Sequence, residues 1–425
     1  MTIKALSRHG LLGPSAILMT IKLMAALLAF IFHFLLARQL SIQEYGLFSL
    51  ALTCLVFSGA FAKQGVEPAI VRYFAQKDRT DIHSLYIYVL LFIVTNIVVV
   101  GLVLLFSADF VFDTLLNTVE LSELLPLIIG LTALQTCLAV NSSALKGRHF
   151  PVSSMLFTGF LSHLFAVAFL YFQPVSSALE ALNLLFYAVC GTVFLSFIVT
   201  KMKLMITFTA PEPIKRSGII ELYHTSRVLF VSSLASLISQ QFAVLILARS
   251  VSLSEVGIYS VAIKVSMLMS YPLFVLNAIT APKYAALFSQ GKMQGFRHLA
   301  WITTKSLIVI ATLLFTGVAI FSKEIVSLFG EHYLAAAPIL IILAAGQWFN
   351  LATGSVVSIL VMTGYEKIHR RNSLFAAVMT IVTMFFCVPI YGIWAAAWLT
   401  AIIMALFNLV SLFFVSRLIY SRHAK

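Results

Sequence analysis

Twelve apolar segments constrain how this 425-residue chain can fold more than any other feature of its sequence. A helix of about 20 apolar residues crosses the roughly 30 Å hydrocarbon core of a bilayer, and proline, glycine and charged clusters separate the segments. The predicted spans are 12–36, 45–66, 85–108, 122–143, 152–172, 178–200, 227–248, 256–280, 300–321, 336–362, 373–390 and 393–416. The sequence therefore predicts an all-α polytopic membrane protein.

The composition supports this class. Hydrophobic residues make up 61% of the chain and charged residues only 10%, so a soluble domain of this size would expose far too much apolar surface. The first apolar run is too long for the core of a cleavable signal peptide, and we expect it to remain as a span. The cysteines lie inside apolar runs without paired spacing, which predicts buried thiols rather than disulfides or a metal site. They are Cys54, Cys137, Cys190 and Cys387.

The distribution of basic residues tests the number of spans. If both termini are cytoplasmic, the inner segments hold 23 of the 28 lysines and arginines, as the positive-inside rule requires. A miscounted span would scramble this alternation for every later segment. The net charge of +13 is therefore a topology signal and does not indicate nucleic-acid binding. We predict twelve transmembrane helices with both ends in the cytoplasm.

A repeat at a spacing of 211 residues divides the chain into two similar halves. Eight positions of the first copy recur in the second: Leu36, Ala37, Arg38, Ser41, Glu44, Gly46, Ser49 and Ala51 match Leu247, Ala248, Arg249, Ser252, Glu255, Gly257, Ser260 and Ala262. Each half has six spans, so the copies are parallel and related by an axis along the membrane normal. We expect two six-helix bundles, 1–210 and 211–425, around a central cavity.

Lys22 and His33 are the first candidates for lining that cavity. Lys22 lies roughly 15 Å from the cytoplasmic end of its span at 1.5 Å per residue, and His33 follows eleven residues later on the same face. Lys22 could instead snorkel to the interface, and His33 could be an ordinary hydrogen-bonded histidine near a helix end.

Lys264 is a stronger candidate because it lies deep within its predicted span. An ammonium facing lipid at that depth costs several kcal/mol, so we expect it to face a wet cavity. Gly257, Ser260 and Tyr271 share its helical face. Pro272 predicts a kink or flexible point in the same span.

Polar side chains on other spans support a cavity more weakly. Gln347 and Asn350 form part of a polar stripe on the tenth span, although hydrogen bonding between helices explains such stripes equally well. At the predicted outer rim, Arg38 and Arg249 could pair locally with Glu44 and Glu255 or guard the cavity mouth.

The chemistry that the spans lack is also informative. No Asp or Glu lies in the middle of a predicted span, whereas proton- and sodium-driven carriers generally need an intramembrane carboxylate. We find no nucleophile–base pair and no metal-ligand cluster, and the outer loops leave no room for a catalytic domain. The sequence predicts a transporter rather than an enzyme, without a cofactor or a bound metal.

Short motifs resemble those of a known family. The stretch LLARQLSIQEYGLFSLA after the first helix resembles the N-terminal motif of Wzx-type polysaccharide flippases, which belong to the multidrug/oligosaccharidyl-lipid/polysaccharide exporter superfamily. The helix ends ALKGRHF at 144–150 and VMTGYEK at 361–367 are similar to paired helix ends of that family. The resemblance covers the whole chain through topology, but its motifs identify the superfamily better than the substrate.

The resemblance implies movement of an undecaprenyl-pyrophosphate-linked oligosaccharide from the cytoplasmic to the outer leaflet of a bacterial inner membrane, for O-antigen, capsule or exopolysaccharide synthesis. It also implies a glycan polymerase and a chain-length regulator as protein partners. A cavity with Lys22 and Lys264 and no carboxylate would attract the diphosphate, and we expect alternating access by two rocking bundles. The alternatives are a cation-coupled multidrug exporter of the same superfamily and a membrane glycan polymerase or glycosyltransferase, and the repeat and the short outer loops argue against the enzyme.

Overall fold

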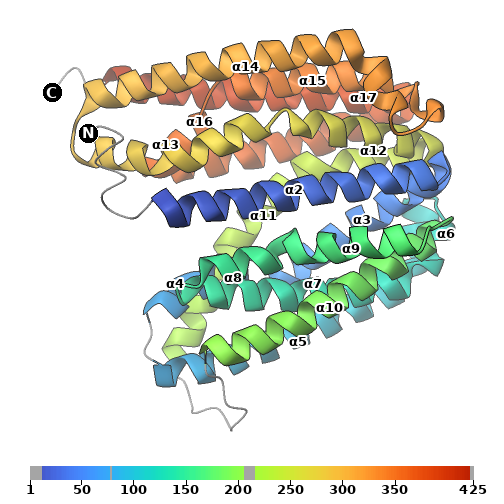
Figure 1. Cartoon of the computed structure of the whole chain (residues 1–425), viewed down its shortest axis with the longest axis horizontal. Helices are drawn as coiled ribbons and strands as arrows, with labels where there is room; N and C mark the ends of the chain where they lie inside the picture. Colours follow the sequence, from blue (N-terminus) through green and yellow to red (C-terminus); the bar gives the residue numbers. More distant parts are fainter. Residues whose placement is uncertain (1–11, 77–78, 205–215, 422–425) are drawn as a thin grey trace. The chain divides into compact units, whose positions relative to one another are not determined.

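The computed structural model describes residues 12–76, 79–204 and 216–421, and these residues form helices and connecting turns without a β-strand (Figure 1). This all-α architecture confirms the fold class predicted from the apolar segments. It follows from the bilayer, where a backbone that satisfies its own hydrogen bonds avoids a large desolvation cost.

The contacts divide the chain into two compact units, and each is described by itself. Unit 1 contains α2 and Leu50–Leu234, and unit 2 contains Ile42–Ser49 and the described chain from Ala235 onward. Two helices, α3 (Ile42–Lys63) and α11 (Arg216–Ser250), therefore contribute residues to both units. The predicted boundary at 210/211 lies outside the described residues and stays a prediction.

Unit 1 is built mainly from helices of the first half of the chain. Besides parts of α3 and α11 it contains α2 (Leu12–Gln39), α4 (Val66–Gln76), α5 (Arg79–Ala108), η1 (Asp109–Leu115), α6 (Glu120–Glu123), α7 (Leu125–Gly147), α8 (Pro151–Met155), η2 (Leu156–Phe160), α9 (Leu161–Phe172) and α10 (Ala178–Leu204). The helix α7 packs against α4, α5 and α10, and α2 packs against α8 and α9.

A close approach between α4 and α7 fixes one side of unit 1. Ile70 and Phe74 of α4 are fully buried against α5 and α7. A Cβ atom at Gly147 would lie 2.7 Å from the Cβ of Phe74 and 2.9 Å from the carbonyl oxygen of Val71, so only glycine fits at this end of α7. The contact holds the C-terminal end of α7 beside the middle and C-terminal half of α4.

Unit 2 contains the remaining helices. They are α12 (Leu253–Leu268), α13 (Tyr271–Ser289), α14 (Met293–Ser327), η3 (Glu331–Tyr333), α15 (Ala336–Ala352), α16 (Val356–Met362) and α17 (Glu366–Ser421). The core includes Tyr284 and Phe296, whose ring centroids are 5.5 Å apart, and the Tyr284 hydroxyl lies 2.6 Å from Oγ1 of Thr303.

Ten described helices are long and apolar enough to cross a membrane, and the α15–α16 pair, bent by 42°, passes the same test together. The longest of the ten, Glu366–Leu418, covers 53 residues, or about 80 Å at 1.5 Å per residue, and it breaks at Gly392, where φ is 56° and ψ is −138°. Each arm of α17 is long enough to cross by itself. The number of twelve spans and the cytoplasmic termini stay predictions.

The kink expected near Pro272 is confirmed in position. The helix α12 ends at Leu268, and α13 starts at Tyr271 with Pro272 in its first turn. Because of this break, Lys264 and Tyr271 do not share one uninterrupted helical face. The sequence prediction placed them on one face by assuming a single straight helix.

The two copies of the repeat meet at Gly46 and Gly257, the glycines that recur at the spacing of 211 residues. A Cβ atom at Gly46 would overlap the carbonyl oxygen of Leu253, and one at Gly257 would overlap the carbonyl oxygen of Ile42. Ile42 and Leu253 are themselves 211 positions apart, so the contact is reciprocal, as in a two-fold related pair. All four residues belong to unit 2.

We expect Gly46→Ala to lower the stability of unit 2, because the added methyl group would displace the α12 backbone. Overpacking of this kind costs about 1–3 kcal/mol, and the apparent Tm of the purified protein in detergent would measure the loss. Gly59→Ala on the same helix is the matched control, since a Cβ there meets no atom within 4 Å. An unchanged Tm for Gly46→Ala would contradict the close contact.

Candidate functional site

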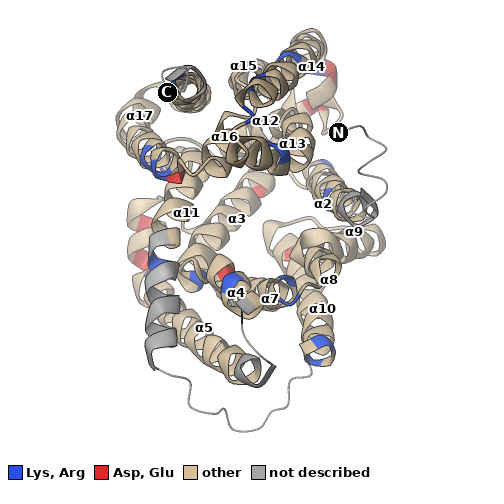
Figure 2. Ribbon diagram, turned by 90° about the vertical axis from the view of Figure 1, so that its left-hand side faces the viewer, with Lys and Arg blue, Asp and Glu red and all other residues tan. Residues whose placement is uncertain are grey.

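A pocket of about 720 Å³ lies within unit 1. It is bounded by residues of α2, α3, α4, α7, α8, η2, α9 and α10. Figure 2, which looks at the ends of these helices, shows basic residues at the ends of α4, α7 and α10. The charged and polar lining residues are Lys22, His33, Lys63, Glu67, Gln135, Ser142, Ser143, Lys146, Ser154, Thr158, Ser162 and His163.

One side of the pocket is cationic. Lys63 ends α3, Lys146 lies in the last turn of α7, and Glu67 lies in the first turn of α4. These positions suit the partial charges of helix ends, which favour cations at the C-terminus and anions at the N-terminus. Together with Lys22 of α2, the pocket has three lysines and one glutamate, a net excess of two positive charges.

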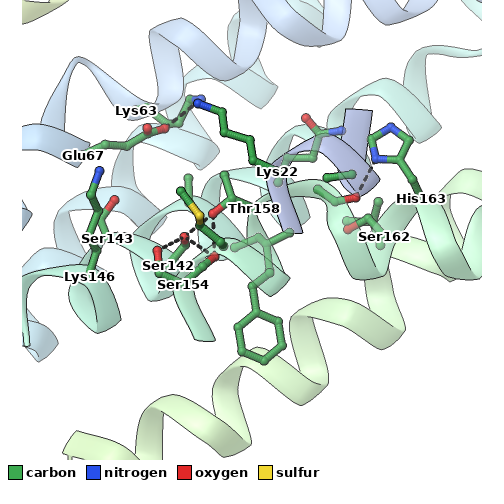
Figure 3. Close-up of a pocket in the computed structure, with 18 of the residues that line it drawn as sticks. Lys22, Lys63, Glu67, Ser142, Ser143, Lys146, Ser154, Thr158, Ser162 and His163 are labelled. Carbon is green, nitrogen blue, oxygen red and sulfur yellow. Dashed lines mark hydrogen bonds and ion pairs between the residues drawn. The ribbon is translucent and has the colours of Figure 1, made fainter. Parts of the chain in front are cut away.

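Glu67 is paired within the pocket. Its Oε1 lies 2.9 Å from Nζ of Lys63, and both side chains are about one-third exposed. In Figure 3 the side chain of Lys22 extends toward the same side of the pocket as Lys63 and Glu67. The prediction of a cavity without carboxylates is therefore wrong for this pocket. Glu67 lies one residue beyond the predicted span 45–66, and the turn between α3 and α4 directs its side chain into the pocket.

The turn between α3 and α4 sets the position of this ion pair. Gln64 has a φ of 45° and Gly65 a φ of 71°, and a left-handed backbone reverses a helix within two residues. A Cβ atom at Gly65 would lie 2.5 Å from the carbonyl oxygen of Ser226 and 2.6 Å from the amide nitrogen of Phe230. The turn is thus packed directly on the α11 backbone within unit 1.

A hydroxyl cluster lies beside the cationic side (Figure 3). The Ser142 hydroxyl is 2.9 Å from the hydroxyl of Ser154, 2.5 Å from that of Thr158 and 3.0 Å from the Ser154 carbonyl oxygen. Thr158 also donates to the Ser154 carbonyl at 2.6 Å. The buried hydroxyl of Ser162 makes no hydrogen bond to the described residues. These groups can donate to and accept from a polyhydroxylated ligand.

The backbone is irregular at this cluster. Thr158 has a ψ of 49° and Gly159 a φ of 112°, so the helix breaks in η2. Nδ1 of His163 lies 2.6 Å from the carbonyl oxygen of Gly159, beside this break. The buried ring of Phe32 contacts both histidine rings, with centroid distances of 5.7 Å to His33 and 6.3 Å to His163.

The structure separates the residues predicted to bind substrate into two groups. Lys22 and His33 line the unit 1 pocket, and their role in binding substrate stays a prediction. The others belong to unit 2 and do not line this pocket: they are Lys264, Tyr271, Gln347 and Asn350. Asn350 Nδ2 donates to Gln347 Oε1 at 3.2 Å; both residues lie on α15, so this bond does not test the interpretation of hydrogen bonding between helices. Cavity roles for these four residues stay predictions.

The arginines of the repeat have other contacts as well. The guanidinium of Arg38 lies 5.8 Å from the centroid of the Phe34 ring. Glu255 forms a capping box with Ser252, in which each side chain bonds the backbone N–H of the other residue. The expected pairs of Arg38 and Arg249 with acidic neighbours, and their role at a cavity mouth, stay predictions.

Sequence reasoning missed Lys63, Lys146 and the hydroxyl cluster as pocket residues. The two lysines were interpreted as cytoplasmic topology determinants only. A usable signal existed, because Ser154, Thr158 and Ser162 recur every four residues, which places side chains on one helical face. Lys63 and Glu67 have the same spacing.

The fold and the pocket together define a multi-pass helical membrane protein with an internal polar pocket. The helices can span a bilayer, and a large polar pocket lies inside one helical unit. Among the described residues, no group of three or more His, Cys, Asp or Glu side chains could hold a metal ion.

The chain belongs to the polysaccharide biosynthesis family: the model described as "Polysaccharide biosynthesis protein" matches residues 12–288. This family match agrees with the resemblance to polysaccharide flippases noted in the sequence, and the solved structures below show the fold. Comparison with curated proteins gave no match.

Solved structures show the same fold at low sequence identity. A multidrug resistance MATE family transporter of the MOP superfamily, in an inward-facing conformation, has a TM-score of 0.78 and 14% identity, covering 96% of this chain and 98% of its own. The lipid II flippase MurJ has a TM-score of 0.74 and 15% identity, covering 94% and 87%. A MOP superfamily transporter from Pyrococcus furiosus has a TM-score of 0.62 and 16% identity, covering 97% and 95%.

The charge of the pocket predicts how it treats small charged reagents. The test uses a protein whose native cysteines are replaced and which carries a single new cysteine, either Ser143→Cys in the pocket or Gln173→Cys outside it. For each site we compare the labelling rate with an anionic methanethiosulfonate to the rate with a cationic one. We expect this ratio to be at least about threefold higher at Ser143→Cys, since a cleft lined by charges of one sign concentrates ions of the opposite sign. The rates of labelling measure this preference.

Lys146→Met should reduce the preference at Ser143→Cys, because it removes one of the three lysines of the pocket. No labelling at this cysteine, or equal rates with both reagents, would contradict a water-filled cationic pocket.

Proposed function

We propose that this transporter moves polyprenyl-pyrophosphate-linked oligosaccharide units from the cytoplasmic to the outer leaflet of a bacterial inner membrane. The observation that carries the proposal is the excess of positive charge in the unit 1 pocket, where Lys22, Lys63 and Lys146 face one glutamate. A diphosphate esterified at both ends carries roughly two negative charges at neutral pH, and lysine is a common partner for phosphate oxygens.

The hydroxyl cluster supports a sugar beside the diphosphate. Ser142, Ser154 and Thr158 lie next to the cationic side, together with His163. The volume of about 720 Å³ is within the roughly 300–1,000 Å³ of small-molecule sites, so it suits the head group and its first sugars. The polyprenyl tail would stay in the lipid, and the halves would rock in alternating access.

The family and the fold give independent support. The matching family is one of polysaccharide biosynthesis, and one solved relative by fold is a lipid II flippase. O-antigen, capsule and exopolysaccharide pathways all use such lipid-linked units, and the glycan polymerase and chain-length regulator of such a pathway would be its protein partners.

A multidrug exporter is the main alternative, because a multidrug transporter is among the structures with this fold. A cationic drug would meet an excess of positive charge in the unit 1 pocket, so we expect the protein not to raise drug resistance in an exporter-deficient host. Protection against a panel of cationic drugs would favour the alternative.

Lys22→Met and Lys146→Met test the flippase proposal. Each removes a charge-assisted hydrogen bond to phosphate, worth about 1.5–3 kcal/mol, and should lower transport roughly 10–100-fold. The measurements are surface glycan in a flippase-deleted strain and movement of a fluorescent polyprenyl-pyrophosphate glycan in proteoliposomes. Lys292→Met, an exposed lysine outside the pocket, is the control and should transport normally. Full transport by both pocket variants would refute the assignment.

Lys264 is proposed as a further cation of the transport path, contributed by unit 2. If the substrate contacts it during transport, Lys264→Ala should reduce surface glycan display by about tenfold, the loss of one charged hydrogen bond. Normal display by this variant, at a normal level in the membrane, would show that Lys264 is not essential.

A further inference from the structure

Glu67 is the one feature of the unit 1 pocket that the proposed function leaves unexplained. A site for an anion gains nothing from a carboxylate, yet Glu67 lines the pocket with the three lysines. Its carboxylate contacts Lys63 at 2.9 Å, and neither side chain is buried. An ion pair of this exposure is weak, with a median stabilisation near zero to about 1 kcal/mol.

The carboxylate of Glu67 is therefore weakly paired with Lys63, a lysine that the proposed function assigns to the substrate. A phosphate offers oxygens of the same kind as a carboxylate, but the diphosphate can also reach toward the cationic side chains of Lys22 and Lys146, whereas Glu67 is fixed to α4. Charge-assisted bonds to phosphate are stronger than an exposed carboxylate pair. The exchange of one anion for the other at Lys63 leaves the charge of the lysine compensated throughout.

We propose that Glu67 is an internal counter-ion, which holds Lys63 in the empty pocket and is displaced from it by a phosphate of the incoming diphosphate. The inference rests on the proposed function and adds a regulatory step to it. The carboxylate excludes weak anions from Lys63 and yields only to a ligand that engages several lysines at once.

The position of the pair gives the exchange a structural consequence. Lys63 and Glu67 flank the left-handed turn at Gln64 and Gly65. That turn packs on the α11 backbone at Phe230, and the rings of Phe61 and Phe230 lie 5.6 Å apart. The exchange removes a bond across the α3–α4 turn, so the turn senses the bound head group.

A binding experiment tests the exchange. The probe is farnesyl pyrophosphate, titrated calorimetrically into the protein in lipid nanodiscs. Glu67→Gln should tighten binding about three- to fivefold, the fold-change that corresponds to an exposed ion pair. Glu120→Gln, which removes an exposed carboxylate of unit 1 outside the pocket, should leave the affinity unchanged.

A double variant separates exchange at Lys63 from a general effect of charge. In a Lys63→Met background, Glu67→Gln should no longer tighten binding, because the competing carboxylate has lost its partner. An equal increase in affinity with and without Lys63 would overturn the proposal, because Glu67 would then act only through general electrostatic repulsion of the ligand. A merely structural pair predicts a lower Tm for Glu67→Gln and no tighter binding, which would also overturn it.

The same data distinguish failure of this inference from failure of the proposed function. If wild-type protein does not bind the probe, or if Lys22→Met and Lys146→Met do not weaken binding, the pocket is not a diphosphate site. If those variants weaken binding but Glu67→Gln does not tighten it, only the exchange step is wrong.

Discussion

The need to satisfy backbone hydrogen bonds in a medium without water governs the whole structure. Helices meet that need within each span, which is why apolar length predicted the architecture so well. The break at Thr158 and Gly159 lies where the chain borders the pocket. Side chains bond backbone carbonyls there: Ser142 and Thr158 bond the Ser154 oxygen, and His163 bonds the Gly159 oxygen. The hydroxyl cluster thus contacts the backbone beside the broken helix and also lines the pocket.

The repeat explains the scaffold, and the departures from it explain the charge of the pocket. At a spacing of 211 positions, Lys63 corresponds to Phe274 and Glu67 to Ala278. The equivalent positions of unit 2 therefore cannot form the same ion pair. The two halves therefore share the repeat but differ in the charge at these positions.

The sequence predicted the helices and part of the site for a physical reason. Hydropathy is a local property, so α2, α7 and α10 begin and end within a few residues of the expected spans. Lys22 and His33 could be singled out as candidates because a polar group inside an apolar run is conspicuous, and both line the unit 1 pocket. Lys63 and Lys146 were missed as pocket residues, since only the folded chain brings the ends of α3 and α7 together. The turn at Gln64 and Gly65, which returns Glu67 to the pocket, has no hydropathy signal.

The glycine contact bears on how the two copies diverged. Because Gly46 abuts the backbone of the second copy and Gly257 abuts that of the first, a side chain acquired by either copy would push against the other. A substitution at either position alone would therefore disturb the contact between the copies. Elsewhere each copy was free to alter its residues independently, as Lys63 and Phe274 illustrate. This mutual contact gives a physical reason why the segment around these glycines still matches its duplicate, since the backbone of each copy limits the side chains that the other can accept.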